Sequence, residues 1–309
     1  MGNQIKTTIL LTIMTVFFML IGKALGGNSG MMTALIFAGG MNFFSYWYSD
    51  KIVLKMYNAS EVSPEEAPDL YDMVRRLAQR SGLPMPKVYI IPQDAPNAFA
   101  TGRNPENAVV AVTQGLLRLM NRSEIEGVLA HELGHIQNRD ILIGTIAATM
   151  AGAVMMLANM ARWSAIFGGF NRSDDGEGGG GFIELIVMAV IAPIAAMLIQ
   201  MAISRSREFM ADATASGMTG NPEGLASALE KLGTYTRRIP METNPSTAHM
   251  FIANPLSGAR MASLFSTHPP IEERVARLRN TRPRQNQNGP GRTQSNMEQE
   301  AKNFWNRLS

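Results

Sequence analysis

Four long apolar segments constrain this 309-residue chain more than any other feature of its sequence. They cover residues 7–25, 31–48, 141–161 and 182–203, and they are almost free of charged side chains. A helix needs about 20 mostly apolar residues to cross the hydrocarbon core of a bilayer. The sequence therefore predicts four membrane spans, arranged as two helical hairpins.

The first hairpin has the better-defined ends. A Gly-Gly-Asn-Ser-Gly run at 26–30 supplies a short turn, and Tyr-Trp-Tyr at 46–48 supplies aromatic side chains suited to a membrane interface. A cleaved signal peptide is the alternative for 7–25, but its apolar core exceeds the usual length of about 7–15 residues.

The fourth segment is the least regular of the four. It contains Glu184, Pro193 and Gln200. Membrane helices tolerate such residues when neighbouring helices satisfy the freed polar groups. A buried helix of a soluble domain is the alternative interpretation of this segment.

The apolar segments divide the chain into five parts. Residues 1–49 and 141–203 form the two predicted hairpins, whereas 50–140 and 204–283 have soluble composition. The start of 284–309 is rich in Gln, Asn, Pro and Gly, which predicts a flexible tail. Within the first soluble part, the sequence also predicts strands at 87–91 and 108–113, and an extended or turn segment between them.

Basic residues predict the orientation of the chain. Lys51, Lys55, Arg139, Arg205 and Arg207 all lie close to the ends of predicted spans, on the soluble parts. Short loops rich in Lys and Arg remain on the cytoplasmic side of a membrane. Both soluble parts, and both termini, are therefore predicted to face the cytoplasm.

Composition excludes several classes of function. The chain has no cysteine, which rules out disulfides, thiolate metal ligands and a cysteine nucleophile. The formal net charge is only +3, and no Lys/Arg-rich block with interleaved aromatic residues is present. We therefore expect no nucleic-acid partner.

The chemistry is concentrated in His-Glu-Leu-Gly-His at 131–135. Ser63 to Glu66 and Ser123 to Glu126 each match a capping box, and the second predicts a helix that carries this motif. On that helix His131 and His135 share one face and can bind one metal ion, while Glu132 can accept a proton from the attacking water. Two buried, hydrogen-bonded histidines are the alternative, but a chain with only four histidines rarely matches the pattern by chance.

A third ligand must come from another segment. Glu208 and Asp212 are four residues apart and share a helix face. One can bind the metal while the other accepts the N–H of a ligating histidine. Antiparallel third and fourth spans would return this pair to the membrane face where His135 lies. Two histidines and a carboxylate, without cysteine, suit zinc.

Four motifs together resemble the HtpX family of heat-shock membrane metalloproteases, bacterial relatives of the CaaX-prenyl proteases. They are Pro-Asn-Ala-Phe-Ala-Thr-Gly at 96–102, His-Glu-Leu-Gly-His at 131–135, Ser-Arg-Ser-Arg-Glu-Phe-Met-Ala-Asp at 204–212 and Ser-Thr-His-Pro-Pro at 266–270. The resemblance covers residues 1–280, including the order of the spans.

The resemblance implies the roles of the individual residues. His131, His135 and Glu208 match the ligands of one zinc ion per chain, Glu132 matches the catalytic base, and Asp212 matches the aspartate behind the ligands.

Two further positions match motifs at the edge of the site. The segment from Asn97 to Ala100, with Ala98 and Phe99, matches an edge strand that lies along the substrate. His268 matches a histidine that could assist at the oxyanion, although a structural histidine before Pro269 fits the sequence equally well.

The family also implies a fold and an activity. The expected fold is mainly α, with four transmembrane helices and a cytoplasmic zincin-like α+β metalloprotease domain. The expected protein is a membrane-bound zinc endopeptidase of the bacterial inner membrane, contacting the lipid bilayer. It would hydrolyse misfolded or damaged membrane proteins under stress, and a homo-oligomer remains open.

Two rival functions follow from the same sequence. A specific processing protease, like the prenyl-protease relatives, would use the same metal site. A catalytically silent membrane scaffold or zinc-binding protein would not need Glu132, because metal storage requires no general base.

Overall fold

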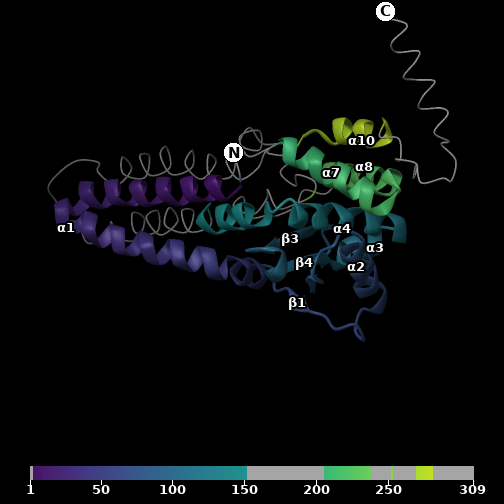
Figure 1. Cartoon of the computed structure of the whole chain (residues 1–309), viewed down its shortest axis with the longest axis horizontal. Coiled ribbons are helices and arrows are strands. Elements are labelled where there is room, and N and C mark those ends of the chain that lie inside the picture. The colour runs from purple at the N-terminus through teal and green to yellow at the C-terminus, as the bar shows by residue number, and fades with distance from the viewer. Residues whose placement is uncertain (1–2, 152–204, 239–251, 253–268, 281–309) are drawn as a thin grey trace, which may run out of the picture.

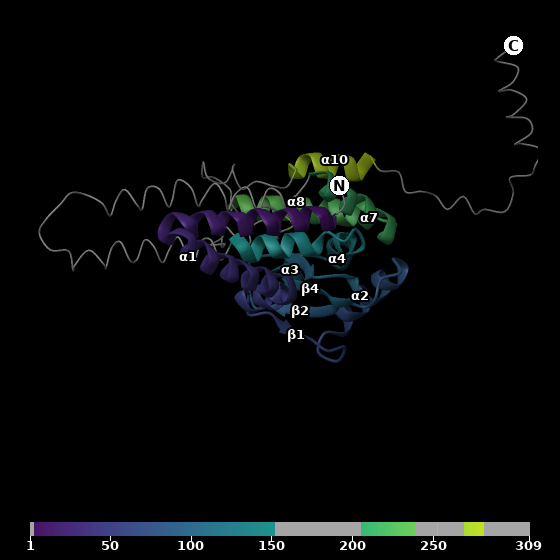
Figure 2. The same cartoon turned by 60° about the vertical axis from the view of Figure 1, so that its left-hand side comes forward.

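The chain is mainly helical with one small mixed sheet. The computed structural model describes residues 3–151, 205–238, 252 and 269–280, and Figures 1 and 2 show their arrangement. The helices are α1 (Asn3–Met56), α2 (Pro68–Arg80), α3 (Gln114–Leu119), α4 (Arg122–Gln137), α7 (Arg205–Thr219), α8 (Pro222–Arg238) and α10 (Ile271–Asn280). The strands are β1 (Ser60–Glu61), β2 (Lys87–Ile91), β3 (Ala98–Gly102) and β4 (Ala108–Thr113), with a 3-10 turn at Pro105–Asn107.

Helix α1 doubles back on itself as two antiparallel limbs (Figure 1). The limbs contact each other through Asn42, whose Nδ2 donates to Thr15 Oγ1 at 2.9 Å, and through the rings of Phe18 and Phe37, whose centroids are 5.9 Å apart. Residues 141–151 are also helical, and their apolar side chains pack against both limbs. Much of the second predicted hairpin falls in 152–204, outside the described residues.

The outer surface of α1 is unusually apolar. Among the described residues, every large hydrophobic side chain that is exposed belongs to α1, apart from Met210. Soluble monomers rarely expose a continuous apolar surface of this kind, so α1 requires another apolar environment or partner. Within the described part of the chain, no helix combines the length and the apolarity needed to cross a membrane.

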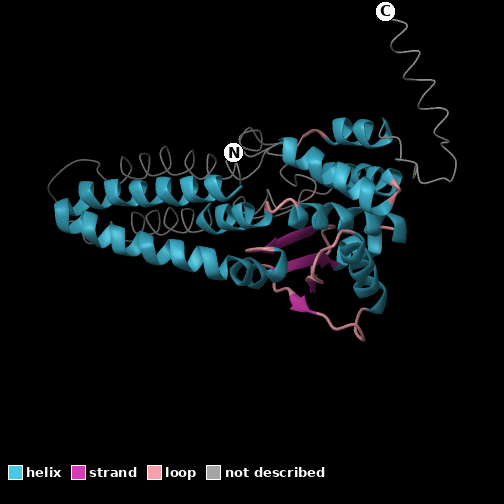
Figure 3. Ribbon diagram, viewed as in Figure 1, coloured by secondary structure: helices cyan, strands magenta, loops and turns pink. Residues whose placement is uncertain are grey.

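The sheet has the order β1-β2-β4-β3, with β2 and β4 parallel and the other pairs antiparallel. Every residue of β4 is buried, whereas β3 forms an edge of the sheet. Figure 3 shows the strands lying beside α4. The strands predicted at 87–91 and 108–113 match β2 and β4, and the segment between them contains the edge strand β3.

Neither predicted capping box marks the start of a helix, although the hydrogen bonds of the first one form. Ser63 and Glu66 do exchange hydrogen bonds, but they close a turn, and α2 begins only at Pro68. Helix α4 is capped by Asn121 and Glu124, two residues earlier than the Ser123 box. Asn121 is the N-cap residue of α4. Its side-chain oxygen accepts the backbone N–H of Glu124, and the carboxylate of Glu124 accepts the backbone N–H of Asn121.

Two glycines let other helices approach α4 closely. A Cβ at Gly127 would lie 2.5 Å from the backbone nitrogen of Leu225 in α8. A Cβ at Gly134 would lie 3.2 Å from the carbonyl oxygen of Ala211 in α7. Helix α4 is therefore the central element, and α7 and α8 pack directly on its backbone.

We expect Gly127→Ala to destabilise the fold, because the added methyl group meets the backbone of α8 rather than a movable side chain. Overpacking of this kind costs about 1–3 kcal/mol in the free energy of unfolding. Gly217→Ala in α7 is the control, since its Cβ would meet nothing within 4 Å and alanine favours a helix. Thermal unfolding of both variants tests this, and equal melting temperatures would contradict it.

Candidate metal centre

Helix α4 presents two imidazoles on one face. His131 and His135 are one turn apart, and their Nε2 atoms lie 3.1 Å from each other. His131 is 1% exposed, while His135 lies nearer the surface. The two nitrogens therefore converge on a shared point at the edge of the core.

Helix α7 brings Glu208 to the same point. Its Oε1 lies 3.5 Å from Nε2 of His135, and its Oε2 lies 3.8 Å from Nε2 of His131. Glu208 is buried, and the close packing of Gly134 on Ala211 holds the two helices at this separation. The structure thus unites segments that are more than 70 residues apart in the sequence.

These three side chains match the geometry of a metal site. One ligand atom from each lies within 4.8 Å of the others. Zinc binds histidine nitrogen and carboxylate oxygen at about 2.0–2.2 Å in a tetrahedron, which separates neighbouring ligand atoms by about 3.4 Å. The observed separations bracket that value, so the residues present fit a zinc ion.

Each histidine is oriented from behind by a carboxylate. Asp212 Oδ1 lies 2.9 Å from Nδ1 of His131, and Asp140 Oδ2 lies 3.2 Å from Nδ1 of His135. Such contacts fix the ring and the tautomer, which leaves Nε2 to face the metal. Asp140 was missed by the sequence analysis, although its position just after α4 could have suggested this role.

A buried arginine from α10 completes the cluster. The Nη2 and Nε atoms of Arg274 donate to the two carboxylate oxygens of Asp212 at 2.7 and 2.9 Å, and its Nη1 donates to the carbonyl oxygen of Ile252 at 3.0 Å. Nη1 also lies 3.6 Å from Oε2 of Glu208. Nothing in the sequence singled out Arg274 among the arginines of α10, because only the packing shows which of them faces inward.

The catalytic candidate Glu132 faces the edge strand. Its Oε2 accepts the backbone N–H of Ala100 at 2.9 Å, and the side chain is 4% exposed. Ala100 lies in the middle of β3, so this N–H is directed out of the open edge of the sheet. The base and the edge strand are therefore in direct contact.

The side chains of Asn97, Ala98 and Phe99 are buried behind this edge. The side chain of Asn97 accepts the N–H of Ile252 at 3.4 Å, and the ring of Phe99 packs on Tyr57 with centroids 5.6 Å apart. All three residues are at most 2% exposed, backbone included, so within β3 only Ala100 is partly exposed. His268, the remaining predicted site residue, lies outside the described residues.

The buried charged groups around the two histidines do not balance one another. The site buries four carboxyl groups and two guanidinium groups, those of Glu132, Asp140, Glu208, Asp212, Arg207 and Arg274. With all of them ionised, two negative charges remain uncompensated, and buried charge is costly unless it is paired. One divalent cation carries the charge that neutralises the cluster.

The pKa values of the carboxyl groups reflect this crowding. Burial raises the pKa of Glu132 to about 7, with the charge of Glu208 adding to the rise and that of His135 opposing it. Burial alone would also raise the pKa of Asp212, but Arg274 and His131 lower it to about 2. Glu132 is thus poised to exchange a proton near neutral pH, whereas Asp212 stays ionised.

The pKa values of the two histidines are shifted in opposite directions. Burial lowers the pKa of His131, and its hydrogen bond to Asp212 does not fully offset that effect. Burial also acts to lower the pKa of His135, but the hydrogen bond to Asp140 and the charge of Glu208 raise it to about 9. In the metal-free protein a proton on His135 therefore supplies part of the missing positive charge.

Residues 64–282 match peptidase family M48. The chain is 65% identical over its full length, and over the full length of each relative, to proteins described as "Protease HtpX homolog" in Desulfatibacillum aliphaticivorans and Desulforapulum autotrophicum. A homologue of the same description in Thermococcus kodakarensis is 59% identical over 89% of this chain and 94% of its own. The crystal structure of S. mikatae Ste24p superposes on this chain with a TM-score of 0.48 and 19% sequence identity. The superposition covers 89% of this chain and 65% of Ste24p, which is just under two thirds of the length of Ste24p.

We expect zinc binding to the metal-free protein to release a proton from His135. Because the pKa of this group is raised to about 9, the apparent affinity should rise about tenfold per pH unit up to that value and then level off. Competition with a chelator, measured between neutral and alkaline pH, tests this. Asp140→Asn should lower the pKa and move the plateau to lower pH, and a flat profile for the wild type would contradict the assignment.

Proposed function

The chain belongs to peptidase family M48 and is a metalloprotease; from that premise we propose that it is a zinc endopeptidase that works at a membrane surface. The observation that carries the proposal is the convergence of His131, His135 and Glu208 beside the buried Glu132. These residues would hold one zinc ion, which when bound supplies Lewis-acid activation of a water molecule and of the scissile carbonyl.

Glu132 is the proposed general base. A base works best when its pKa lies near the working pH, and burial places that of Glu132 at about 7. It would take a proton from the attacking water and later donate it to the leaving amine. Asp212 and Asp140 would keep the two imidazoles aligned during these steps, and Arg274 would hold Asp212 in place.

The unpaired edge of β3, at the partly exposed Ala100, is the proposed substrate-binding surface. An extended peptide can add to such an edge through backbone hydrogen bonds, with little demand on its side chains. The N–H of Ala100 is one of the donors that a substrate strand would use, and Glu132 accepts it here. A bound substrate would therefore compete for this N–H, and its loss would make Glu132 a stronger base.

Membrane anchoring is the second part of the proposal. Its support is the exposed apolar surface of α1 together with the apolar segments at 7–25, 31–48, 141–161 and 182–203. We propose that these segments form four spans of a bacterial inner membrane and that the metalloprotease domain faces the cytoplasm. His135 lies only six residues before 141–161, so the metal would be near the membrane surface.

This placement suggests the class of substrate. A site near the bilayer, with an edge strand that recognises backbone, would reach unfolded or extended segments of membrane proteins more easily than compact soluble domains. We therefore propose misfolded or damaged membrane proteins as substrates, with a role in stress-related quality control. A homo-oligomer is compatible with the exposed surface of α1.

Two substitutions separate the catalytic role from the ligand role. Glu132→Gln should keep stoichiometric zinc while casein hydrolysis falls by a factor of about 10²–10⁴, the usual contribution of a general base. Glu208→Ala should lose most of the zinc as well as the activity. Metal analysis and the casein assay on both proteins provide the measurement.

The outcomes distinguish the possible roles clearly. If Glu208→Ala keeps its zinc, Glu208 is not the third ligand, and Asp212 and His268 are the next candidates. Full activity in Glu132→Gln would contradict the proposed chemistry, and a wild type that binds zinc but never hydrolyses casein would favour a zinc-binding scaffold.

Reporter fusions test the orientation. A reporter fused after residue 175 should report a location outside the cytoplasm, whereas one fused after residue 110 should report the cytoplasm. The prediction follows from the basic residues on 50–140 and the charge-free segment 141–161. A cytoplasmic signal from the fusion at 175 would show that the third and fourth segments do not cross the membrane as proposed.

A further inference from the structure

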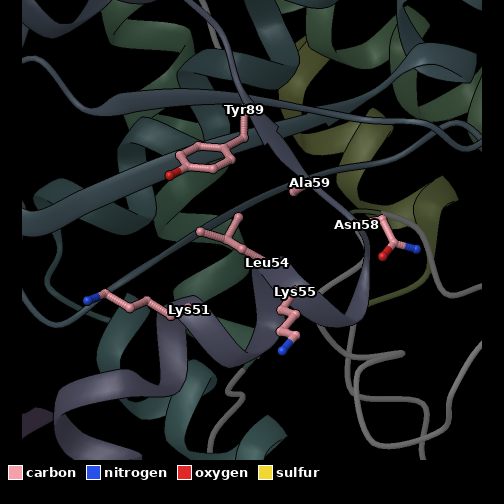
Figure 4. Close-up of a pocket in the computed structure, with 6 residues that line it drawn as sticks. All are labelled: Lys51, Leu54, Lys55, Asn58, Ala59 and Tyr89. Atoms are coloured by element: carbon pink, nitrogen blue, oxygen red, sulfur yellow. The ribbon is translucent and has the colours of Figure 1, made fainter.

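A hollow of about 480 Å³ opens on the surface where α1 ends (Figure 4). It lies between the last turns of the helix and the start of the sheet. The residues that line it are Lys51, Leu54, Lys55, Asn58, Ala59 and Tyr89. None of them takes part in the metal centre.

Positive charge dominates the rim of the hollow. Lys51 and Lys55 are one helical turn apart and exposed, and neither forms an ion pair with any residue that the structure describes. Asn58 adds an exposed amide, and buried Leu54 and half-buried Ala59 supply apolar lining. Figure 4 shows the side chains of Lys51, Lys55 and Asn58 pointing in different directions, so the two exposed lysines would turn toward a shared anionic ligand.

Acidic groups are near the hollow but do not line it. The carboxylate of Glu61 accepts the Tyr89 hydroxyl at 2.9 Å and lies 3.1 Å from Nζ of Lys87, so its charge is already compensated. Asp50 acts on Tyr89 through its charge without lining the cavity. A ligand in the hollow would meet the two lysines on the α1 side, while the carboxylates of Glu61 and Asp50 act on the Tyr89 side, where burial and then these carboxylates raise the pKa of Tyr89 to about 12.

The surroundings identify the kind of surface on which the hollow lies. Tyr46, Trp47 and Tyr48 precede it on α1 and expose about two fifths of their surfaces. Nζ of Lys51 lies 5.3 Å from the centre of the Tyr48 ring, and the Arg103 guanidinium lies 4.5 Å from that of Trp47. Aromatic rings interleaved with basic groups are typical of the headgroup level of a membrane.

We propose that this hollow binds the phosphate headgroup of an anionic phospholipid. The inference rests on the membrane anchoring proposed above and goes beyond it by naming a site and a ligand. The two lysines attract the phosphate, and Leu54 and Ala59 accept the glycerol portion. A zwitterionic headgroup gains less, because the two lysines that line the hollow would repel its ammonium group.

Leu54 connects the hollow to the core of the domain. Leu54 belongs to a buried cluster that includes Tyr57, Phe99 of the edge strand and Ala148 of the helix at 141–151. A headgroup held against Leu54 would therefore fix the orientation of the edge strand relative to the bilayer surface.

Native mass spectrometry of the full chain tests the site. The protein, in detergent, is offered phosphatidylglycerol and phosphatidylcholine with identical acyl chains, and the ratio of the two bound lipids is measured. Because a basic residue near an anionic lipid favours binding by roughly 5-fold, Lys51→Gln/Lys55→Gln should lower the preference for phosphatidylglycerol by up to roughly 25-fold. Arg75→Gln/Arg118→Gln, which removes two exposed charges from α2 and α3, is the control and should keep the wild-type ratio.

Three results would overturn the proposal. The lysine variant could keep the wild-type preference, both double variants could lose it equally, or added inorganic phosphate could displace the lipid, which would indicate a free-phosphate site. Flotation with phosphatidylcholine vesicles and casein hydrolysis are measured in parallel. If the protein floats and cleaves casein while the lysine variant binds lipid normally, only the headgroup site is wrong; if the wild type does not float, the anchoring itself fails.

Discussion

Compensation of buried negative charge is the constraint on which the rest of this structure depends. Four carboxyl groups converge around His131 and His135, and two arginines neutralise only half of their charge. The remaining charge makes the cluster stable only with a bound dication or with protons on groups such as His135. Burial raises the pKa of Glu132 to about 7, while the charges of His135 and Arg274 oppose the rise and that of Glu208 adds to it. Metal affinity and catalytic proton transfer therefore both depend on the burial of this cluster.

The fold delivers these charges through close helix packing. Gly134, inside the metal-binding motif, lets the backbone of α7 approach α4 so that Glu208 reaches both histidines. Helix α10 then seals the cluster with Arg274, whose guanidinium ties Asp212 to the carbonyl oxygen of Ile252. On the other side of Glu132 no further strand pairs with the edge of β3 among the described residues, and Ala100 is the partly exposed residue of that strand. The charged cluster is thus enclosed, and the proposed substrate contact lies at Ala100.

Local motifs predicted the chemistry better than the architecture. The spacing of His131 and His135 predicted their shared face, the structure brings Glu208 to them, and the family resemblance is confirmed by the relatives. Arg274 was not predicted, because an inward-facing arginine has no sequence pattern of its own, whereas the position of Asp140 just after α4 was an unused signal. The cap of α4 was misplaced because two overlapping patterns, Asn121 to Glu124 and Ser123 to Glu126, both match a capping box, and only the hydrogen bonds decide between them. The sequence predicted membrane spans at 7–25 and 31–48; α1 exposes apolar side chains there, and its crossing of a membrane stays a proposal.

Zinc-edge X-ray absorption of the purified full-length protein tests the central claim most directly. The account predicts one zinc ion per chain, with first-shell nitrogen and oxygen ligands at about 2.0–2.2 Å and the multiple-scattering signature of two imidazoles. It also predicts no heavier ligand, because the chain contains no cysteine. A shell with no imidazole scattering, or a protein that remains folded at neutral pH and binds no dication, would contradict the claim that the buried cluster is built around a metal.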